Sequence, residues 1–267
     1  MNQTHKTEFL WAGDEKETSP RMVLYPPTGS KAGQPGKGAP AVIIFPGGGY
    51  AGQAAHEGEP IGRLFAQNGF YAFVLFYRVS PNRFPAPYAD AVRGVRLVRS
   101  RAKEYGIDPE RIAVMGFSAG GHLASLVATR PDLYLDPKDE LANTISARVN
   151  GAILCYPVIS FVNFPHLGSC HNLLGSDVSY AKRCEFSTEL WVDEKTPPTF
   201  LFHTAEDPGV PVENAYLFAS ACYKKNVKVE LHVFPDGRHG VGLAEDHPRL
   251  KVWSELLIRW AKEWAEK

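Results

Sequence analysis

Ser118 is the residue in this sequence best placed to act as a nucleophile, because it stands at the centre of the pattern Gly-Phe-Ser-Ala-Gly at residues 116–120. A short apolar run at 111–115 precedes the pattern, and a segment of helical composition at 122–128 follows it. Glycines two positions before and after the serine leave room for a tight turn between a strand and a helix. The alternative interpretation is that Ser118 only caps the helix. The flanking strand and helix favour an exposed nucleophilic hydroxyl.

A serine hydroxyl becomes a good nucleophile when a base takes its proton, and His239 and Asp207 are the candidates for that base and for the acid that orients it. Asp207 follows an apolar strand predicted at 199–204, and His239 follows another at 229–234. Because parallel strands end at a common edge of the sheet, both side chains are expected beside Ser118. Each residue also has a simpler interpretation, as a turn-starting aspartate and as a loop histidine between glycines. Their order and shared edge favour the catalytic interpretation.

Three consecutive glycines at residues 47–49 follow an apolar strand predicted at 41–45. They fit an ordinary turn, but they also allow backbone N–H groups to point at an incoming oxyanion without interference from side chains. An acyl-transfer enzyme needs such donors in this loop. The serine pattern further along the chain favours this second interpretation.

The rest of the sequence alternates between predicted strands and helices, which indicates an α/β fold with a mostly parallel sheet and helices on both faces. Further strands are predicted at 22–25, 70–76 and 149–157, and helices at 61–68, 89–105, 212–225 and 248–265. The strand at 22–25 is expected at the edge of the sheet. Four arginines of one long helix are expected to form its solvated face: Arg93, Arg96, Arg99 and Arg101.

Residues 160–195 lack clear periodicity and mix aromatic, polar and small side chains, so they are predicted to form a cap or lid inserted above the pocket. The whole chain, 1–267, is expected to be a single domain that carries this insertion. Polar residues in the insertion, among them His166 and His171, disfavour a tunnel for long acyl chains. Trp191 suits two roles, a contact in a homo-oligomer or stacking on a sugar ring.

Histidines outside the serine constellation show no spacing typical of metal ligands, and they are interpreted as structural: His56, His122, His166, His171, His203 and His232. His122 lies close to the serine, yet core packing is the favoured role for it. Tyr77 and Arg78 follow the strand at 70–76 and are candidates to border the site, although a salt bridge explains Arg78 equally well.

The charge balance points away from polyanionic partners, because lysine plus arginine and aspartate plus glutamate both total 29 in the 267 residues. A small neutral molecule is therefore the expected partner, with no nucleic acid and no membrane. The opening residues contain no apolar signal core, and no run approaches the roughly 18 apolar residues of a membrane span. The chain is thus expected to be cytoplasmic. There Cys170 and Cys184, which would suit a bridge in an exported protein, are expected to be free thiols.

Four motifs together resemble those of the α/β-hydrolase carboxylesterases, and specifically the branch of acetylxylan esterases or carbohydrate acetyl esterases. They are Phe-Pro-Gly-Gly-Gly-Tyr at 45–50, the serine pattern at 116–120, His-Thr-Ala-Glu-Asp at 203–207 and Gly-Arg-His-Gly at 237–240. The resemblance extends from about residue 22 to the last predicted helix. It implies an α/β-hydrolase fold, on which the catalytic residues follow one another as serine, acid and histidine.

By position in these motifs, the resemblance implies that Ser118 is the nucleophile, His239 the general base and Asp207 the acid that orients the base. Glu206 is the adjacent rival for the acid. Pro46 stands where the hormone-sensitive lipase pattern has a histidine, which favours the acetyl esterase branch and leaves the orientation of the glycine loop unexplained. The resemblance also implies an oxyanion hole formed by the backbone N–H groups of three residues: Gly48, Gly49 and Ala119.

The resemblance implies a serine esterase that hydrolyses short-chain, chiefly acetyl, esters of acetylated sugars or xylo-oligosaccharides through an acyl-enzyme. No metal or organic cofactor is expected for this reaction. The alternatives are a general short-chain carboxylesterase, a peptidase of the prolyl-oligopeptidase type and a non-catalytic binding protein. The peptidase is disfavoured because the chain has no amino-terminal propeller. The binding protein is disfavoured because all three catalytic candidates are present.

Overall fold

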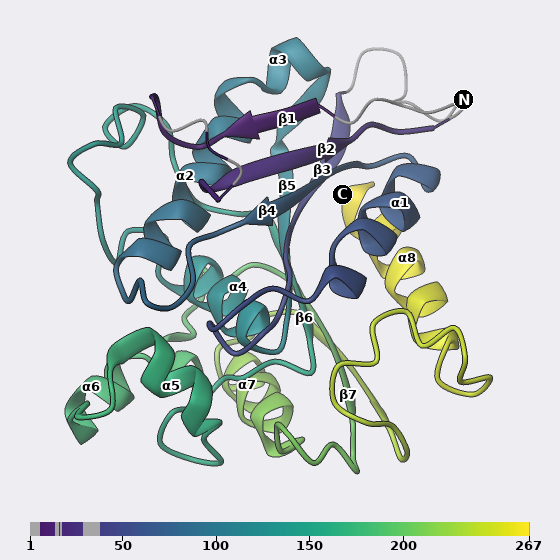
Figure 1. The fold of residues 1–267 in the computed structure, drawn as a ribbon. Coiled ribbons are helices and arrows are strands. Elements are labelled where there is room, and N and C mark those ends of the chain that lie inside the picture. The colour runs from purple at the N-terminus through teal and green to yellow at the C-terminus, as the bar shows by residue number, and fades with distance from the viewer. Residues whose placement is uncertain (1–5, 14–15, 17, 29–37, 267) are drawn as a thin grey trace.

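An eight-stranded sheet runs through the molecule in a computed structural model that describes residues 6–13, 16, 18–28 and 38–266 (Figure 1). Its strand order is β1-β2-β4-β3-β5-β6-β7-β8. β1 and β2 are antiparallel to their neighbours, and all pairs from β4 to β8 are parallel. The strands are β1 (Lys6–Phe9), β2 (Arg21–Tyr25), β3 (Ala39–Phe45), β4 (Tyr71–Phe76), β5 (Ile107–Phe117), β6 (Gly151–Cys155), β7 (Thr199–Thr204) and β8 (Val229–Phe234).

Helices cover both faces of the sheet, as the alternating sequence predicts (Figure 1). One face carries α2 (Ala86–Ser100), α4 (Ala119–Thr129) and α7 (Glu213–Lys224), and the other carries α1 (Glu59–Gln67) and α8 (Val252–Ala265). Every residue of β6 is buried, because a parallel strand covered on two sides needs a continuous apolar run. The shorter elements are η1 (Ala55–Glu57), α3 (Ala102–Tyr105), α5 (Leu167–Leu174), α6 (Tyr180–Glu185) and η2 (Thr188–Trp191).

The prediction that residues 22–25 form an edge strand is wrong, because β1 pairs along the outer side of β2. β1 has the sequence Lys-Thr-Glu-Phe, and most of its side chains are not buried. The sequence therefore has no apolar run here that would predict a strand. A short polar strand of this kind is a common way to protect the edge of a sheet. The edge prediction failed because the true edge strand is not hydrophobic.

The prediction of a solvated arginine face on the long helix is also wrong for Arg93 and Arg96, which are 4% and 1% exposed. Both contact Asp139, with Nη1 of Arg93 2.6 Å from Oδ1 and Nη1 of Arg96 2.7 Å from Oδ2. Asp139 lies in the irregular connection between α4 and β6, which brings this carboxylate to α2. We call these three side chains the Arg93–Asp139–Arg96 cluster. It buries charges that helical periodicity alone places at the surface.

The turn from β5 into α4 is strained and tightly packed. Ser118 has φ +52° and ψ −118°, a conformation that side-chain-bearing residues rarely adopt. A Cβ atom added to Gly116 would collide with the backbone of Gly120, and one added to Gly120 would collide with the carbonyl of Phe45. The glycines on either side of the serine therefore allow β3, β5 and α4 to meet at this point.

Two sequence expectations concern the chain as a whole. Within the described ranges, no helix has both the length and the apolar character needed to cross a bilayer. Cys155, Cys170, Cys184 and Cys222 are all free thiols, so Cys170 and Cys184 form no bridge in this structure.

Candidate active site

Ser118, His239 and Asp207 meet at the carboxyl edge of the sheet, in the order that the sequence predicts. Nε2 of His239 lies 2.8 Å from Oγ of Ser118, and its Nδ1 lies 2.7 Å from Oδ2 of Asp207. The serine follows β5, the aspartate follows β7 and the histidine follows β8. The Ser118 hydroxyl makes no capping bond to α4. The hydroxyl therefore faces the imidazole rather than its own helix.

Asp207 is buried and holds its charge through several donors, whereas Glu206 is exposed. Oδ1 of Asp207 accepts hydrogen bonds from the backbone N–H groups of Gly209 at 2.8 Å and Val210 at 2.9 Å. Burial by itself raises the pKa of Asp207, but the hydrogen bonds from His239 and these two N–H groups outweigh it, so the pKa is lowered. The ionised carboxylate then accepts Nδ1–H of His239, which leaves Nε2 free to accept the serine proton.

The glycine loop after β3 passes directly beside the serine. A Cβ atom added to Gly47 would lie 3.0 Å from Cβ of Ser118. Gly48 and Gly49 have φ values of +131° and +64°, so the loop relies on glycine conformations. In the described part of the chain, no acceptor binds the N–H groups of Gly48, Gly49 or Ala119. These donors are therefore available to a ligand at Ser118.

Glu57 is a residue of the site that the sequence interpretation missed. Its Oε2 accepts the N–H of Gly47 at 2.7 Å, and its Oε1 accepts the hydroxyl of Tyr156 at 2.8 Å. The same Tyr156 oxygen accepts the N–H of Gly242 at 3.1 Å, and the tyrosine ring packs edge-on against His239 with centroids 5.3 Å apart. One buried carboxylate thus fixes the glycine loop relative to the loop after β8, which carries His239. Glu57 lies ten residues after Gly47, and no familiar sequence motif has that spacing.

Pro46, the departure from the lipase pattern, is held by a different side chain. Its carbonyl oxygen accepts the hydroxyl of Tyr77 at 2.6 Å. Burial, with a smaller contribution from Glu57, raises the pKa of Tyr77 far above its usual range, so the phenol remains a donor. Tyr77 therefore supports the glycine loop, while Arg78 forms a salt bridge to Asp90 at 2.7 Å.

Two histidines near the site have different surroundings. His122 is fully buried, with Nδ1 2.9 Å from the Tyr50 hydroxyl and Nε2 2.8 Å from the carbonyl of Phe186. Burial lowers its pKa from 6.5 to about 4, so it is a neutral core residue, as the sequence interpretation favours. His166 is half-buried at the start of α5, and its Cε1 would lie 4.0 Å from a Cβ atom on Gly49. A purely structural interpretation of His166 is therefore incomplete.

The segment at 160–195 contains α5, α6 and η2 and is attached to the site by side chains. Nδ2 of Asn172 donates to the carbonyl of Gly49 at 2.9 Å, which joins α5 to the glycine loop. Oγ of Ser125 donates to Oγ1 of Thr188 at 2.9 Å, which joins η2 to α4. Trp191 is 41% exposed, and the guanidinium of Arg130 covers one face of its ring at 4.0 Å.

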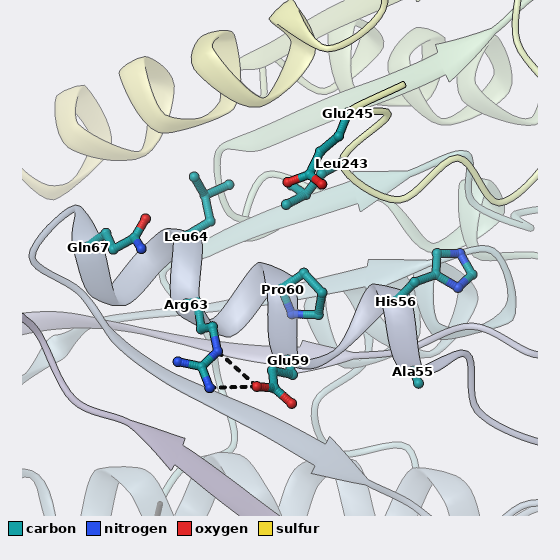
Figure 2. A pocket seen from close by; sticks show the side chains of 9 residues that line it. All are labelled: Ala55, His56, Glu59, Pro60, Arg63, Leu64, Gln67, Leu243 and Glu245. Atoms are coloured by element: carbon teal, nitrogen blue, oxygen red, sulfur yellow. Dashed lines mark hydrogen bonds and ion pairs between the residues drawn. The ribbon is translucent and has the colours of Figure 1, made fainter. Parts of the chain in front are cut away.

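A cavity of about 640 Å³ adjoins the loop that carries His239, but none of Ser118, Asp207 and His239 lines it (Figure 2). Helix α1 forms one wall, and Leu243 and Glu245 form the other. Glu59 and Arg63 on the α1 wall pair with each other at 2.6 Å. His56 links the two regions, because its Nε2 lies 2.9 Å from the carbonyl of Gly240.

The groups at Ser118 are those that acyl transfer requires. A hydroxyl faces an imidazole, a carboxylate accepts a hydrogen bond from that imidazole, and the N–H groups of Gly48, Gly49 and Ala119 have no acceptor in the described part of the chain. Among the described residues, no three histidine, cysteine or acidic side chains are grouped so that they could hold a metal ion.

Comparisons with known proteins point to the same chemistry. Residues 25–222 match the BD-FAE family. The chain is 40% identical over 209 residues to endo-1,4-beta-xylanase B of Butyrivibrio fibrisolvens, across 77% of the chain and 33% of that protein. It is 34% identical over 208 residues to the acetylxylan esterase of Xylanibacter ruminicola, across 76% of the chain and 41% of that protein. The chain thus spans well under half the length of these two curated relatives.

A solved structure is similar over almost the whole length of both chains. It is the acetyl ester-xyloside bifunctional hydrolase of Caldicellulosiruptor lactoaceticus, which is 43% identical to this chain with a TM-score of 0.87. The match covers 97% of this chain and 96% of that one.

Proposed function

The chain belongs to the BD-FAE family and has the α/β-hydrolase fold, and from this premise we propose that it is a carboxylic ester hydrolase for short-chain, chiefly acetyl, esters. The proposed substrates are acetylated sugars or xylo-oligosaccharides. The observation that carries the proposal is the 2.8 Å approach of His239 Nε2 to Ser118 Oγ beside unoccupied N–H donors. The activities for which the acetylxylan esterase and the acetyl ester-xyloside hydrolase are named support the substrate class.

In the proposed first step, Oγ of Ser118 attacks the ester carbonyl while Nε2 of His239 takes the hydroxyl proton. The carbonyl oxygen becomes an oxyanion and is stabilised by the glycine-loop N–H groups and that of Ala119. Each such donor typically contributes about 2.7–4 kcal/mol to transition-state stabilisation. His239 then gives its proton to the departing alcohol oxygen, and the acetyl group remains on Ser118. Asp207 stabilises the imidazolium throughout.

In the proposed second step, a water molecule gives a proton to Nε2 of His239 and attacks the acetyl carbonyl. The tetrahedral intermediate collapses, Oγ of Ser118 leaves and takes the proton from His239, and acetic acid is released and ionises to acetate and a proton in the solvent. Electrons and protons balance without any further reactant.

The proposal includes one α/β-hydrolase domain over 1–267, with residues 160–195 acting as a cap over the site. The bond between Asn172 and the Gly49 carbonyl supports this role, because it places α5 against the loop that receives the ester. A cytoplasmic location and a homo-oligomeric state stay predictions from the sequence.

The test is hydrolysis of p-nitrophenyl acetate, p-nitrophenyl octanoate and acetylated xylo-oligosaccharides by the wild type and by Ser118→Ala. We expect acetate release from both acetyl substrates, much slower hydrolysis of the octanoate and loss of activity in the variant. Peptide mapping after treatment with diethyl p-nitrophenyl phosphate should place the covalent adduct on Ser118. Activity that survives in Ser118→Ala, or an adduct on another residue, would contradict the mechanism.

A short-chain carboxylesterase with no sugar preference is the competing function. It predicts that acetylated xylo-oligosaccharides have no advantage in kcat/KM over simple alkyl acetates, whose leaving groups are also alcohols. The ratio of kcat/KM values between these substrates separates the two functions.

A further inference from the structure

His166 carries a hydrogen-bond donor that the protein itself leaves unused. Its Nδ1 accepts the backbone N–H of Ser169 at 3.2 Å and lies 2.8 Å from the Ser169 hydroxyl. Since Nδ1 is an acceptor, the ring proton resides on Nε2. Nothing in the part of the chain that the structure describes accepts this N–H. Burial and the charge of His239 lower the pKa of His166, and Asp207 opposes them only in part, so the ring is a neutral donor at pH 7.

The imidazole is also held in a fixed position at the edge of the site. Its Cε1 would lie 4.0 Å from a Cβ atom on Gly49, and Asn172 from the same helix binds the Gly49 carbonyl at 2.9 Å. Farther along α5, the carbonyl of Leu173 accepts the N–H of Phe84 at 2.9 Å. The donor is therefore attached to a helix with contacts on two sides. It can serve a ligand without a rearrangement of the cap.

The position of this donor suits the alcohol portion of an ester better than its carbonyl oxygen. Three backbone N–H groups, those of Gly48, Gly49 and Ala119, are already unoccupied next to Ser118. An oxyanion is satisfied by two or three hydrogen bonds, so these groups are enough for it. His166 lies on the cap side of Gly49, where the remainder of the substrate would extend.

We propose that Nε2–H of His166 binds the alcohol portion of the substrate by donating a hydrogen bond to a hydroxyl or ring oxygen of an uncharged sugar. The inference rests on the esterase function proposed above and names the chemistry of its leaving group. A neutral donor discriminates between an alcohol with oxygen acceptors and a plain aryl or alkyl alcohol. His166 is thus a specificity residue for polyhydroxylated acetyl esters.

The decisive variant is His166→Asn. The Asn side-chain oxygen takes the place of Nδ1 and still accepts the Ser169 N–H, so the start of α5 keeps its cap, while the Nε2 donor is removed. The kcat/KM on acetylated xylobiose should fall about tenfold more than the kcat/KM on p-nitrophenyl acetate, as loss of one neutral hydrogen bond predicts. His166→Gln, whose amide nitrogen reaches the place of Nε2, should recover part of the loss. His171→Asn, five residues farther along α5 and about 140° around it, is the matched control and should change neither value.

Three results would overturn the inference. Equal losses on both substrates would make His166 a donor to the oxyanion instead of to the sugar. An unchanged ratio in His166→Asn would show that the sugar does not bind this nitrogen. Inactivity of the wild type on every ester would refute the proposed esterase function itself, and it is distinguishable because the two preceding results both require an active wild type.

Discussion

Two polar networks in this molecule each contain a buried aspartate, but they differ in whether all of their hydrogen-bonding groups are paired within the protein. In the Arg93–Asp139–Arg96 cluster, both carboxylate oxygens accept guanidinium groups, at 2.6 and 2.7 Å. Nε of Arg93 lies 2.9 Å from Leu10 O, Nε of Arg96 lies 3.1 Å from Ile145 O, and Nη2 of Arg93 lies 2.6 Å from Oε1 of Glu140. That cluster is closed, because its charges are paired within the protein.

The network around Ser118 is equally well ordered but open. Asp207 is fully engaged, yet the His239 side chain is 27% exposed and the N–H groups of Gly48 and Gly49 have no acceptor in the described chain. A closed network lowers the free energy of the folded state, whereas an open one contains hydrogen-bond donors without acceptors, which a ligand can bind. Substitutions should therefore change stability in the first network and activity in the second.

The largest expected effect is that of Asp207→Asn on activity. The Asn oxygen still accepts the N–H groups of Gly209 and Val210, but its amide cannot accept Nδ1–H of His239, so the histidine is held in the wrong tautomer. We expect kcat for p-nitrophenyl acetate to fall about 10⁴-fold with little change in KM. Glu206→Gln is the control and should retain activity. A loss of comparable size in the control would move the acid role to Glu206.

The second effect concerns stability, in Asp139→Asn. Removal of this carboxylate takes the Asp139 counter-ion from the buried Arg96 and leaves Arg93 with only the exposed Glu140, and we expect the free energy of unfolding to fall by about 3–5 kcal/mol. The control is Glu140→Gln, because Glu140 pairs with the same Arg93 at 2.6 Å but is 68% exposed. In Glu140→Gln the free energy of unfolding should fall by less than about 1 kcal/mol. Urea unfolding measures both, and equal values would contradict the distinction between closed and surface pairs.

His122 provides a third, pH-dependent difference. Its pKa is 6.5 in the unfolded chain and about 4 in the folded protein, so unfolding takes up a proton between these values. The stabilising contribution is complete above pH 6.5 and is lost as the pH falls towards 4. From pH 7 to pH 5 we expect it to decline by about 2 kcal/mol. Unfolding of His122→Gln should show a shallower pH dependence by that amount, and a slope equal to that of the wild type would contradict the role of His122.

The smallest predicted effect is that of Glu57→Gln. The variant keeps one acceptor oxygen, but the amide NH2 that replaces the other oxygen cannot accept the Gly47 N–H or the Tyr156 hydroxyl, so the glycine loop should be held less firmly. We expect kcat to decrease about tenfold with KM nearly constant, since the affected donors act mainly in the transition state. If Glu57→Gln changes only the stability of the protein, Glu57 belongs to a closed network and does not support activity.

The sequence was informative where a residue and its structural context are neighbours in the chain. Ser118 follows β5 directly, and Asp207 and His239 lie in the loops after β7 and β8, so their meeting at one edge of the sheet is predictable. The activity class follows from the same motifs, and the family match agrees with it.

Partners that lie far apart in the chain were not predictable in this way. Arg93 finds Asp139 from a connection 46 residues away that has no regular structure, and Glu57 reaches Tyr156 across 99 residues. β1 was missed because its four residues are polar. In each case the pairing is chosen by tertiary packing, which leaves no local periodicity in the sequence.

The bond from Asn172 to the Gly49 carbonyl has a practical consequence for enzyme engineering. A library that randomises α5 to change the preference for the alcohol portion would also vary position 172, and most clones would then lose this bond to the glycine loop. Selection would discard them as inactive before their preference could be measured. Holding Asn172 constant while varying the residues around it would keep turnover and selectivity as separately tunable properties.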